Sequence, residues 1–207
     1  MKRPIVAGIV GGVASGKSEV TRLLQERGAH VIHADAIGHR VLLEPSVRDA
    51  VVNHFGQSIL ASDGVQIDRS RLATMVFGTT PEATQNRRWL ESVVHPLIRA
   101  RISDELEREI ARGVPPLIVL DVPLLIESGW IDHCQRVLMV EADEAVRLER
   151  AKKRGWTESS FRDREASQRS LADKRSAATD TVDNSGSLEA LERQVAELVA
   201  RWNRDAQ

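Results

Sequence analysis

A glycine-rich segment near the start of the chain limits the possible folds most sharply. It reads Gly11-Gly12-Val13-Ala14-Ser15-Gly16-Lys17-Ser18, with two glycines five positions apart and then Lys and a hydroxyl residue. This is the spacing of a phosphate-binding P-loop. Glycine allows backbone angles that turn successive N–H groups toward one point at a helix N-terminus, which suits an anion. The segment predicts a nucleoside triphosphate site, in which Lys17 reaches the β- and γ-phosphates and the Ser18 hydroxyl ligates Mg²⁺.

The surrounding residues predict the fold that a P-loop needs. Residues 5–10 are a short apolar run rich in branched side chains, typical of a buried strand, and residues 18–27 have helical spacing. The strand pattern returns at residues 30–33, 117–120 and 137–140. Strands separated by helical stretches predict an α/β fold with a parallel central sheet and helices on both faces, the three-layer architecture of a P-loop NTPase.

A long and mostly helical insert separates the second and third predicted strands. Residues 46–55 predict one helix, and Asp68 is the expected N-cap of a second that runs to Phe77. Residues 81–112 predict a third helix, in which Pro96 forces a kink or a break.

The last third of the chain has a less regular pattern. Asp143 is expected to cap a helix through Arg154, and Ser187 to cap a final helix. Residues 155–180 are polar and charged with weak periodicity, so no helix is assigned there. We expect one domain over residues 1–207, with a core at 1–55, 115–146 and 180–207, a helical insert at 56–114 and a lid at 147–180.

Composition excludes several kinds of partner. The net charge is −1, only 3% of residues are aromatic and Tyr is absent, which argues against binding nucleic acid. No run approaches the roughly 20 apolar residues of a membrane span. Cys134 is the single cysteine, so an internal disulfide is impossible and a reducing cytoplasm is the expected compartment. The sequence leaves the oligomeric state open; we expect a monomer.

Two aspartates follow predicted strands and are candidates for chemistry. Asp35 comes just after the second strand, where a carboxylate can orient an acceptor hydroxyl and accept its proton, or can serve as a helix N-cap. Asp121 ends the third strand and either holds Mg²⁺ through water or caps the strand end. The guanine-reading motif Asn-Lys-x-Asp is absent, which argues against a GTPase.

Residues 147–175 contain ten basic and five acidic residues in a chain of net charge −1. Such a run is either a solvated helix face or a mobile basic lid that closes over a triphosphate and excludes water.

Several further segments together resemble the dephospho-coenzyme A kinase family along nearly the whole chain. The most specific are Leu90-Glu91-Ser92-Val93-Val94-His95-Pro96-Leu97-Ile98 and Val122-Pro123-Leu124-Leu125-Ile126-Glu127. Residues 28–35, 67–72, 164–168 and 182–186 add to the match.

The resemblance implies ATP-dependent phosphorylation of the ribose 3′-hydroxyl of dephospho-coenzyme A, with Mg²⁺, in the last step of coenzyme A synthesis. It makes Asp35 the general base, the insert the acceptor site and residues 147–180 the lid. The catalytic residues implied are Asp35, Lys17, Arg150 and Arg154. The ATP contacts implied are Gly11, Gly12, Val13, Ala14, Ser15, Gly16, Lys17, Ser18, Glu19, Asn184 and Gly186. The substrate contacts implied are Asp35, His95, Pro123, Leu124 and Glu127, and the metal contacts are Ser18 and, through water, Asp121.

Some of these assignments keep an alternative. His95 either contacts substrate or is a buried, hydrogen-bonded residue at a helix break, and Glu127 either orients a partner or caps its loop. The chain departs from the family at three positions. His33 replaces the first Asp of the usual Asp-Ala-Asp, Glu19 replaces the usual small hydroxyl residue after Lys-Ser, and Gly155 replaces the frequent Asp after Arg154. The alternative functions are another P-loop kinase acting on a nucleoside or nucleotide, and an ATP-binding regulatory protein without catalysis.

Overall fold

The structure, a computed structural model, describes residues 3–78 and 80–205. The chain forms two compact units, each described here by itself. One contains the residues up to His33 and those from Leu106 onward, and the other is Ala34–Glu105. The second unit therefore begins directly after the second strand, and residues 34–55 belong to it.

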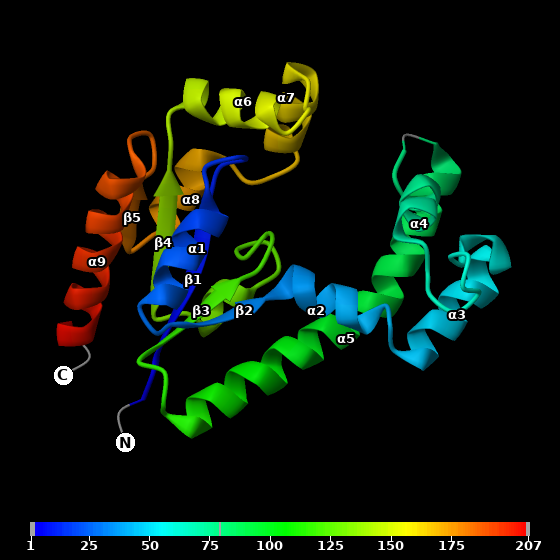
Figure 1. The fold of residues 1–207 in the computed structure, drawn as a ribbon, viewed down its shortest axis with the longest axis horizontal. Coiled ribbons are helices and arrows are strands. Elements are labelled where there is room, and N and C mark those ends of the chain that lie inside the picture. Colours follow the sequence, from blue (N-terminus) through cyan, green and yellow to red (C-terminus); the bar gives the residue numbers. More distant parts are fainter. Residues whose placement is uncertain (1–2, 79, 206–207) are drawn as a thin grey trace. The chain divides into compact units, whose positions relative to one another are not determined.

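A parallel sheet of five strands is the centre of the first unit in the described part of the chain (Figure 1). Its strands are β1 (Ile5–Gly11), β2 (His30–His33), β3 (Leu117–Asp121), β4 (Arg136–Glu141) and β5 (Asp180–Asp183). Their order is β2-β3-β1-β4-β5, so β1 lies between β3 and β4, with Ala7 in register with Val119 on one side and Arg136 on the other. The predicted α/β fold with a parallel sheet is confirmed.

Strand β5 was not expected from the sequence. It lies at the edge of the sheet, and Val182 is its only buried residue. One apolar residue cannot produce a strand pattern, so this strand depends on pairing with β4.

Two helices pack on one face of the sheet. Helix α1 (Lys17–Glu26) contributes Leu23 and Leu24, and α9 (Leu188–Asp205) contributes Leu198 and Trp202. Their side chains form a core with strand residues, among them Ala7, Ile9, Leu138 and Val140. Each fully buried side chain of this size contributes about 1.5–3 kcal/mol. The apolar spacing of the sequence was therefore a reliable guide to this face.

The opposite face is covered by other parts of the first unit. A Cβ on Gly8 would lie 2.4 Å from Leu125 and 2.9 Å from Cys134, so the segment between β3 and β4 packs directly on the strand backbone. That segment includes a 3₁₀ helix, η2 (Trp130–His133). Helix α8 (Leu171–Ala177) contacts β1 and β4. With cover on both faces, the first unit has the expected three layers.

The residues that follow β4 form three helices. The first is α6 (Glu144–Lys153), and Asp143 is its N-cap residue but makes no side-chain capping bond. The stretch 155–180, where the sequence has weak periodicity and no helix was assigned, contains α7 (Glu158–Ala166) and α8. Thr157 and Ser170 accept N-cap hydrogen bonds at the starts of α7 and α8. These caps were the local signal available in a stretch with little apolar periodicity.

The second unit is helical. It contains α2 (Ala34–Val41), α3 (Pro45–Phe55), the 3₁₀ helix η1 (Gln57–Ile59), α4 (Arg69–Val76) and most of α5 (Pro81–Arg112). Asp68 caps α4 as expected, accepting from the N–H groups of Ser70 and Arg71. Of the kink or break expected at Pro96, the break does not occur, since α5 continues through this residue. Pro96 is exposed.

Candidate phosphate-binding site

The P-loop joins the central strand to α1. Strand β1 ends at Gly11 and α1 begins at Lys17, so the loop lies at the carboxyl end of the sheet, where parallel sheets bind ligands. Ala14 and Gly16 have φ angles of 58° and 91°, which lie in the left-handed region. These angles close the loop into a tight turn in which the Ser15 N–H donates to the Gly12 carbonyl at 3.2 Å. The strand–loop–helix arrangement predicted from the motif is present.

The first N–H groups of α1 are available to a ligand. Within residues 3–78 and 80–205, the N–H groups of Gly16, Lys17 and Ser18 have no hydrogen-bond acceptor. They point out of the positive end of the helix dipole. Together they form a nest that stabilises a phosphate group.

Lys17 is surrounded mainly by positive charge. Burial lowers the pKa of its ammonium, Lys174 and Arg154 lower it further, and Asp121 raises it. The Arg154 side chain has no hydrogen-bond or ion-pair partner in the described part of the chain. Lys174 also lies near the carboxylates of Glu127 and Glu165, so the positive charge left for a polyphosphate is mainly that of Lys17 and Arg154.

Asn184 and Arg150 hold the P-loop backbone. The Asn184 side-chain amide donates to the Ser15 carbonyl at 2.8 Å, and Arg150 donates to the same carbonyl at 3.3 Å. Arg150 also donates to the Asn184 carbonyl at 2.8 Å. A Cβ on Gly16 would lie 2.1 Å from the Asn184 amide nitrogen, so glycine is required for this contact. In the structure these two residues contact the loop backbone, and their expected roles toward ATP stay predictions.

Two buried cations that the sequence analysis did not single out also hold the loop. Arg147 donates to the Val13 carbonyl at 3.3 Å and forms an ion pair with Glu165 on α7. Lys174 on α8 donates to the Gly11 carbonyl at 3.2 Å and to Gln168 at 2.7 Å. The basic excess of this segment was visible in the sequence, but not which residues turn inward.

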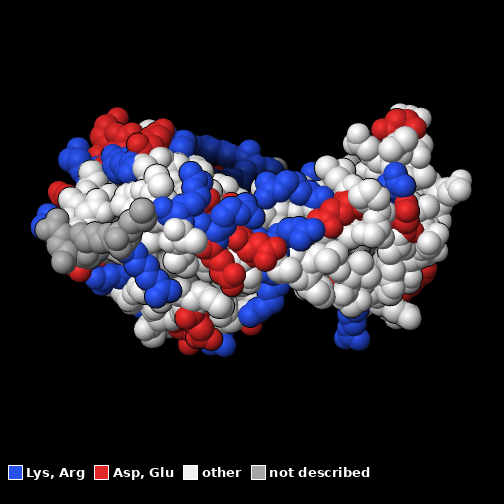
Figure 2. Space-filling model, turned by 90° about the horizontal axis from the view of Figure 1, so that it is seen from below, with Lys and Arg blue, Asp and Glu red and all other residues white. Residues whose placement is uncertain are grey.

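Most other surface cations pair with nearby carboxylates. Arg162 pairs with Glu144, and Arg175 pairs with Glu141 at 2.6 Å. Figure 2 shows the result on one face, where blue and red side chains lie next to each other. This mixed surface suits a small anion bound at one point better than a long polyanion.

Ser18 and Asp121 have the chemistry that Mg²⁺ requires. Ser18 is exposed in the first turn of α1, and the Asp121 carboxylate, 28% exposed, ends β3 close enough to Lys17 to raise its pKa. The described residues contain no cluster of three metal-ligating side chains. Mg²⁺ typically binds one or two protein oxygens together with phosphates and waters, so a hydroxyl and a carboxylate fit it.

The remaining predicted residues of the first unit lie in three places. Glu127 accepts a hydrogen bond from the Arg169 N–H at 3.1 Å, which joins the β3–β4 segment to the loop before α8. Pro123 and Leu124 are exposed, and Leu124 has a φ of 55°. Glu19 pairs with Arg22, 2.5 Å away on α1. Gly186 has open space around its Cα.

Asp35 and His95 belong to the second unit. Asp35 is exposed in the first turn of α2, which begins at Ala34, so it is not an N-cap. His95 is exposed on the continuous helix α5, so it is neither buried nor at a break.

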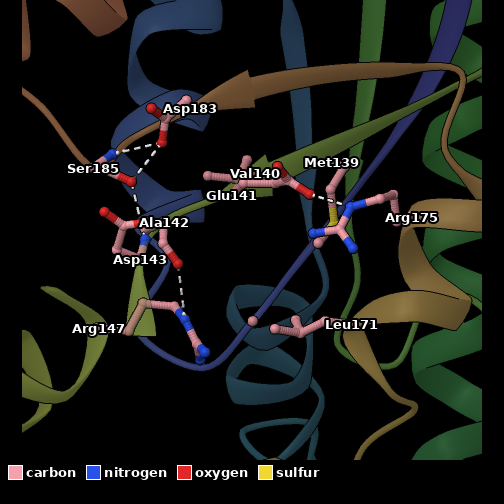
Figure 3. Close-up of a pocket in the computed structure, with 11 residues that line it drawn as sticks. Met139, Val140, Glu141, Ala142, Asp143, Arg147, Leu171, Arg175, Asp183 and Ser185 are labelled. Atoms are coloured by element: carbon pink, nitrogen blue, oxygen red, sulfur yellow. Dashed lines mark hydrogen bonds and ion pairs between the residues drawn. The ribbon is translucent and has the colours of Figure 1, made fainter. Parts of the chain in front are cut away.

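A pocket of ≈ 360 Å³ lies beside the P-loop in the first unit (Figure 3). Figure 3 shows Asp183 and Ser185 on one side of it and Arg175 and Leu171 of α8 on the other. Among the predicted site residues only Gly12 lines it. Of its charged groups, Glu141 pairs with Arg175, Arg147 pairs with Glu165, and Asp183 accepts hydrogen bonds from Ser185.

Comparison with known proteins identifies the family of the chain, which the geometry of the site does not. A family model described as dephospho-CoA kinase matches residues 5–190. The chain belongs to the dephospho-CoA kinase family. The resemblance seen in the sequence is thereby confirmed, including its kinase class.

Relatives of this family match nearly the whole chain. A dephospho-CoA kinase of Halalkalibacterium halodurans is 36% identical over 203 residues, covering 96% of each chain. One from Corynebacterium diphtheriae is 40% identical, covering 95% of this chain and 96% of that one. A crystal structure from Thermus thermophilus superposes with a TM-score of 0.75 at 33% identity, covering 97% of this chain and 98% of that one. A dephospho-CoA kinase structure from Campylobacter jejuni, at 20% identity, a TM-score of 0.71 and coverages of 96% and 97%, has the same fold.

No helix among the described residues combines the length and the apolar composition needed to cross a membrane.

Proposed function

We propose that this protein transfers the γ-phosphoryl group of ATP to the ribose 3′-hydroxyl of dephospho-CoA, producing CoA and ADP. The ATP half of the proposal rests on the P-loop. The N–H groups of Gly16, Lys17 and Ser18 have no acceptor in the described chain, and the Lys17 ammonium beside them lies near further cations. The family supplies the acceptor. Phosphoryl transfer depends mainly on positioning and charge stabilisation, which is what these groups offer.

The P-loop residues act on the phosphates. The N–H groups of Gly16, Lys17 and Ser18 bind phosphate oxygens, and the Lys17 ammonium neutralises charge that builds up during transfer. Ser18 directly and Asp121 through water would hold Mg²⁺, which supplies further charge neutralisation when bound. Arg154, which has no side-chain partner among the described residues, is available to the same phosphates. Arg150, Asn184, Arg147 and Lys174 keep the loop carbonyls fixed, so the N–H groups are oriented before ATP arrives.

Asp35 is the residue we propose for the acceptor hydroxyl. An ionised carboxylate accepts the hydroxyl proton as the oxygen attacks phosphorus, and the proton ends on Asp35 Oδ. We assign the acceptor-binding role to the second unit with His95, and to Pro123, Leu124 and Glu127 after β3. We assign residues 147–180 to the lid that excludes water from the reaction. We place the reaction in the cytoplasm, with the protein as a monomer.

An assay with alternative acceptors tests the proposed function. The protein is mixed with Mg²⁺, ATP and dephospho-CoA, ADP release is followed, and the product is identified as CoA by its 3′-phosphate in ³¹P NMR. ADP release with nucleosides or nucleotides but not with dephospho-CoA would replace this proposal by a kinase of another specificity. ATP binding without turnover on any acceptor would make the protein regulatory.

Asp35→Asn tests the general base. We expect kcat to fall by about 10²–10⁴-fold with KM for ATP unchanged, because the amide cannot accept the proton. A variant that keeps most of its kcat would remove Asp35 from this role.

A further inference from the structure

The imidazole of His33 joins the ends of two neighbouring strands to helix α1. His33 ends β2 and is in register with Asp121, which ends β3. Its Nδ1 lies 3.1 Å from Oδ2 of Asp121, and its Nε2 lies 3.3 Å from the side-chain nitrogen of Gln25 on α1. Each ring nitrogen therefore has one partner, although the side chain is 39% exposed.

The partners determine which ring nitrogen carries the proton. The amide nitrogen of Gln25 can only donate, so Nε2 of His33 must accept. A neutral imidazole has one N–H, which is then on Nδ1 and is donated to Asp121. The Asp121 carboxylate receives this bond on Oδ2, and its Oδ1 takes no hydrogen bond in the described part of the chain.

Asp121 is the carboxylate that faces the P-loop lysine. Its charge raises the pKa of Lys17, whereas burial, Lys174 and Arg154 lower it. A carboxylate at the end of a strand can rotate about its Cβ–Cγ bond, and one fixed hydrogen bond restricts that rotation. Orientation of a ligand by a hydrogen-bonded neighbour is a general property of metal and phosphate sites.

We propose that His33 is a positioning residue: held by Gln25 as the Nδ1–H tautomer, it fixes Asp121 through Oδ2 and leaves Oδ1 to accept a water of the Mg²⁺–nucleotide complex. The proposal rests on the proposed function for the role of Asp121. The contact between the three side chains does not depend on it.

The tautomer is measured without any substrate. Long-range ¹H–¹⁵N spectra of the full chain at about pH 8.5, some two units above the usual His pKa, report both ring nitrogens. We expect His33 to show a protonated Nδ1 and a bare Nε2. A protonated Nε2 in the wild-type protein would overturn the proposal.

Substitutions at His33 measure the effect on nucleotide binding. His33→Phe keeps a ring but has no donor, whereas His33→Asn keeps a side-chain N–H. His33→Phe should weaken Mg²⁺–ADP binding in calorimetry, and raise the Mg²⁺ concentration for half-maximal turnover, by about 10–100-fold. His33→Asn should restore most of the affinity, and His133→Phe on η2 is the matched control that should change neither. Equal affinities for His33→Phe and the wild-type protein would overturn the positioning role.

The two proposals fail in different ways. If no CoA forms but Mg²⁺–ADP binding still depends on the His33 N–H, the acceptor assignment is wrong and the positioning role stands. If CoA forms while His33→Phe binds Mg²⁺–ADP as the wild type does, the positioning role alone is wrong. Circular dichroism of each variant verifies that it is folded.

Discussion

The amide nitrogen of Asn184 lies 2.8 Å from the carbonyl oxygen of Ser15, and this bond ties the loop after β5 to the P-loop across 169 residues of sequence. Asn184 is buried, and Arg150 reaches the same carbonyl from α6. The P-loop is therefore held from behind by side chains of distant segments.

Asn184→Ala should loosen the P-loop. The Ser15 carbonyl would lose one of its two donors, and we expect a loss of about 1–3 kcal/mol in the free energy of unfolding. The Kd for ATP should rise because the N–H groups are no longer fixed in advance. Denaturant unfolding and calorimetry measure the two effects. Unchanged stability and affinity would mean that Arg150 alone is enough to hold the carbonyl.

Gly16→Ala should be far more harmful than Gly28→Ala. Both glycines have positive φ, 91° and 86°, so both substitutions carry the same backbone strain of about 1–2 kcal/mol. Only at Gly16 does the added Cβ meet another group, the Asn184 amide at 2.1 Å, whereas Gly28 has nothing within 4 Å. Thermal unfolding should show the larger Tm loss for Gly16→Ala. Equal losses would indicate that strain alone accounts for both.

Lys17→Ala should reduce kcat by about 10³-fold, the order seen when a group that stabilises transition-state charge is removed. The control is Arg193→Ala, which removes an exposed cation of α9. Steady-state kinetics of the two variants separate a local phosphate contact from a general effect of net charge. Similar rates for both variants would contradict the role of Lys17.

Ser15→Ala should be neutral or slightly stabilising. The Ser15 hydroxyl is buried and has no hydrogen-bond partner in the described part of the chain, and an unsatisfied buried polar group costs about 1–3 kcal/mol. Its removal should leave the carbonyl contacts to Asn184 and Arg150 intact. The measurement is chemical denaturation with and without ATP. A clear loss of stability would show that the hydroxyl does have a partner.

Cys134 should react slowly with thiol reagents in the folded protein. Burial, followed by the nearby Asp132 carboxylate, raises the pKa of its thiol to about 12. At pH 8 only about one thiol in 10⁴ is then the reactive thiolate. Reaction with a chromogenic disulfide should be slow in buffer and fast in urea. Rapid reaction without urea would contradict the burial.

The sequence predicted the elements whose signal is local. The P-loop spacing placed the phosphate site, and the apolar runs placed four of the strands in the described chain, because buried strands and amphipathic helices carry their pattern in neighbouring residues. It did not predict β5, α7 or α8. Their stability comes from contacts with β4 and with buried side chains such as Phe161, not from their own periodicity.

What the sequence determined by itself is therefore the P-loop, the α/β class and the family, since each depends on residue types at fixed spacing. Only the tertiary structure decided how the basic segment is used. Arg147 and Lys174 turn inward to hold loop carbonyls, while Arg154 stays unpaired near Lys17 in the described chain. The tertiary structure also brings the His33 imidazole within hydrogen-bond distance of the Asp121 carboxylate. These contacts join residues far apart in the chain, and parallel pairing and burial, not local spacing, bring them together.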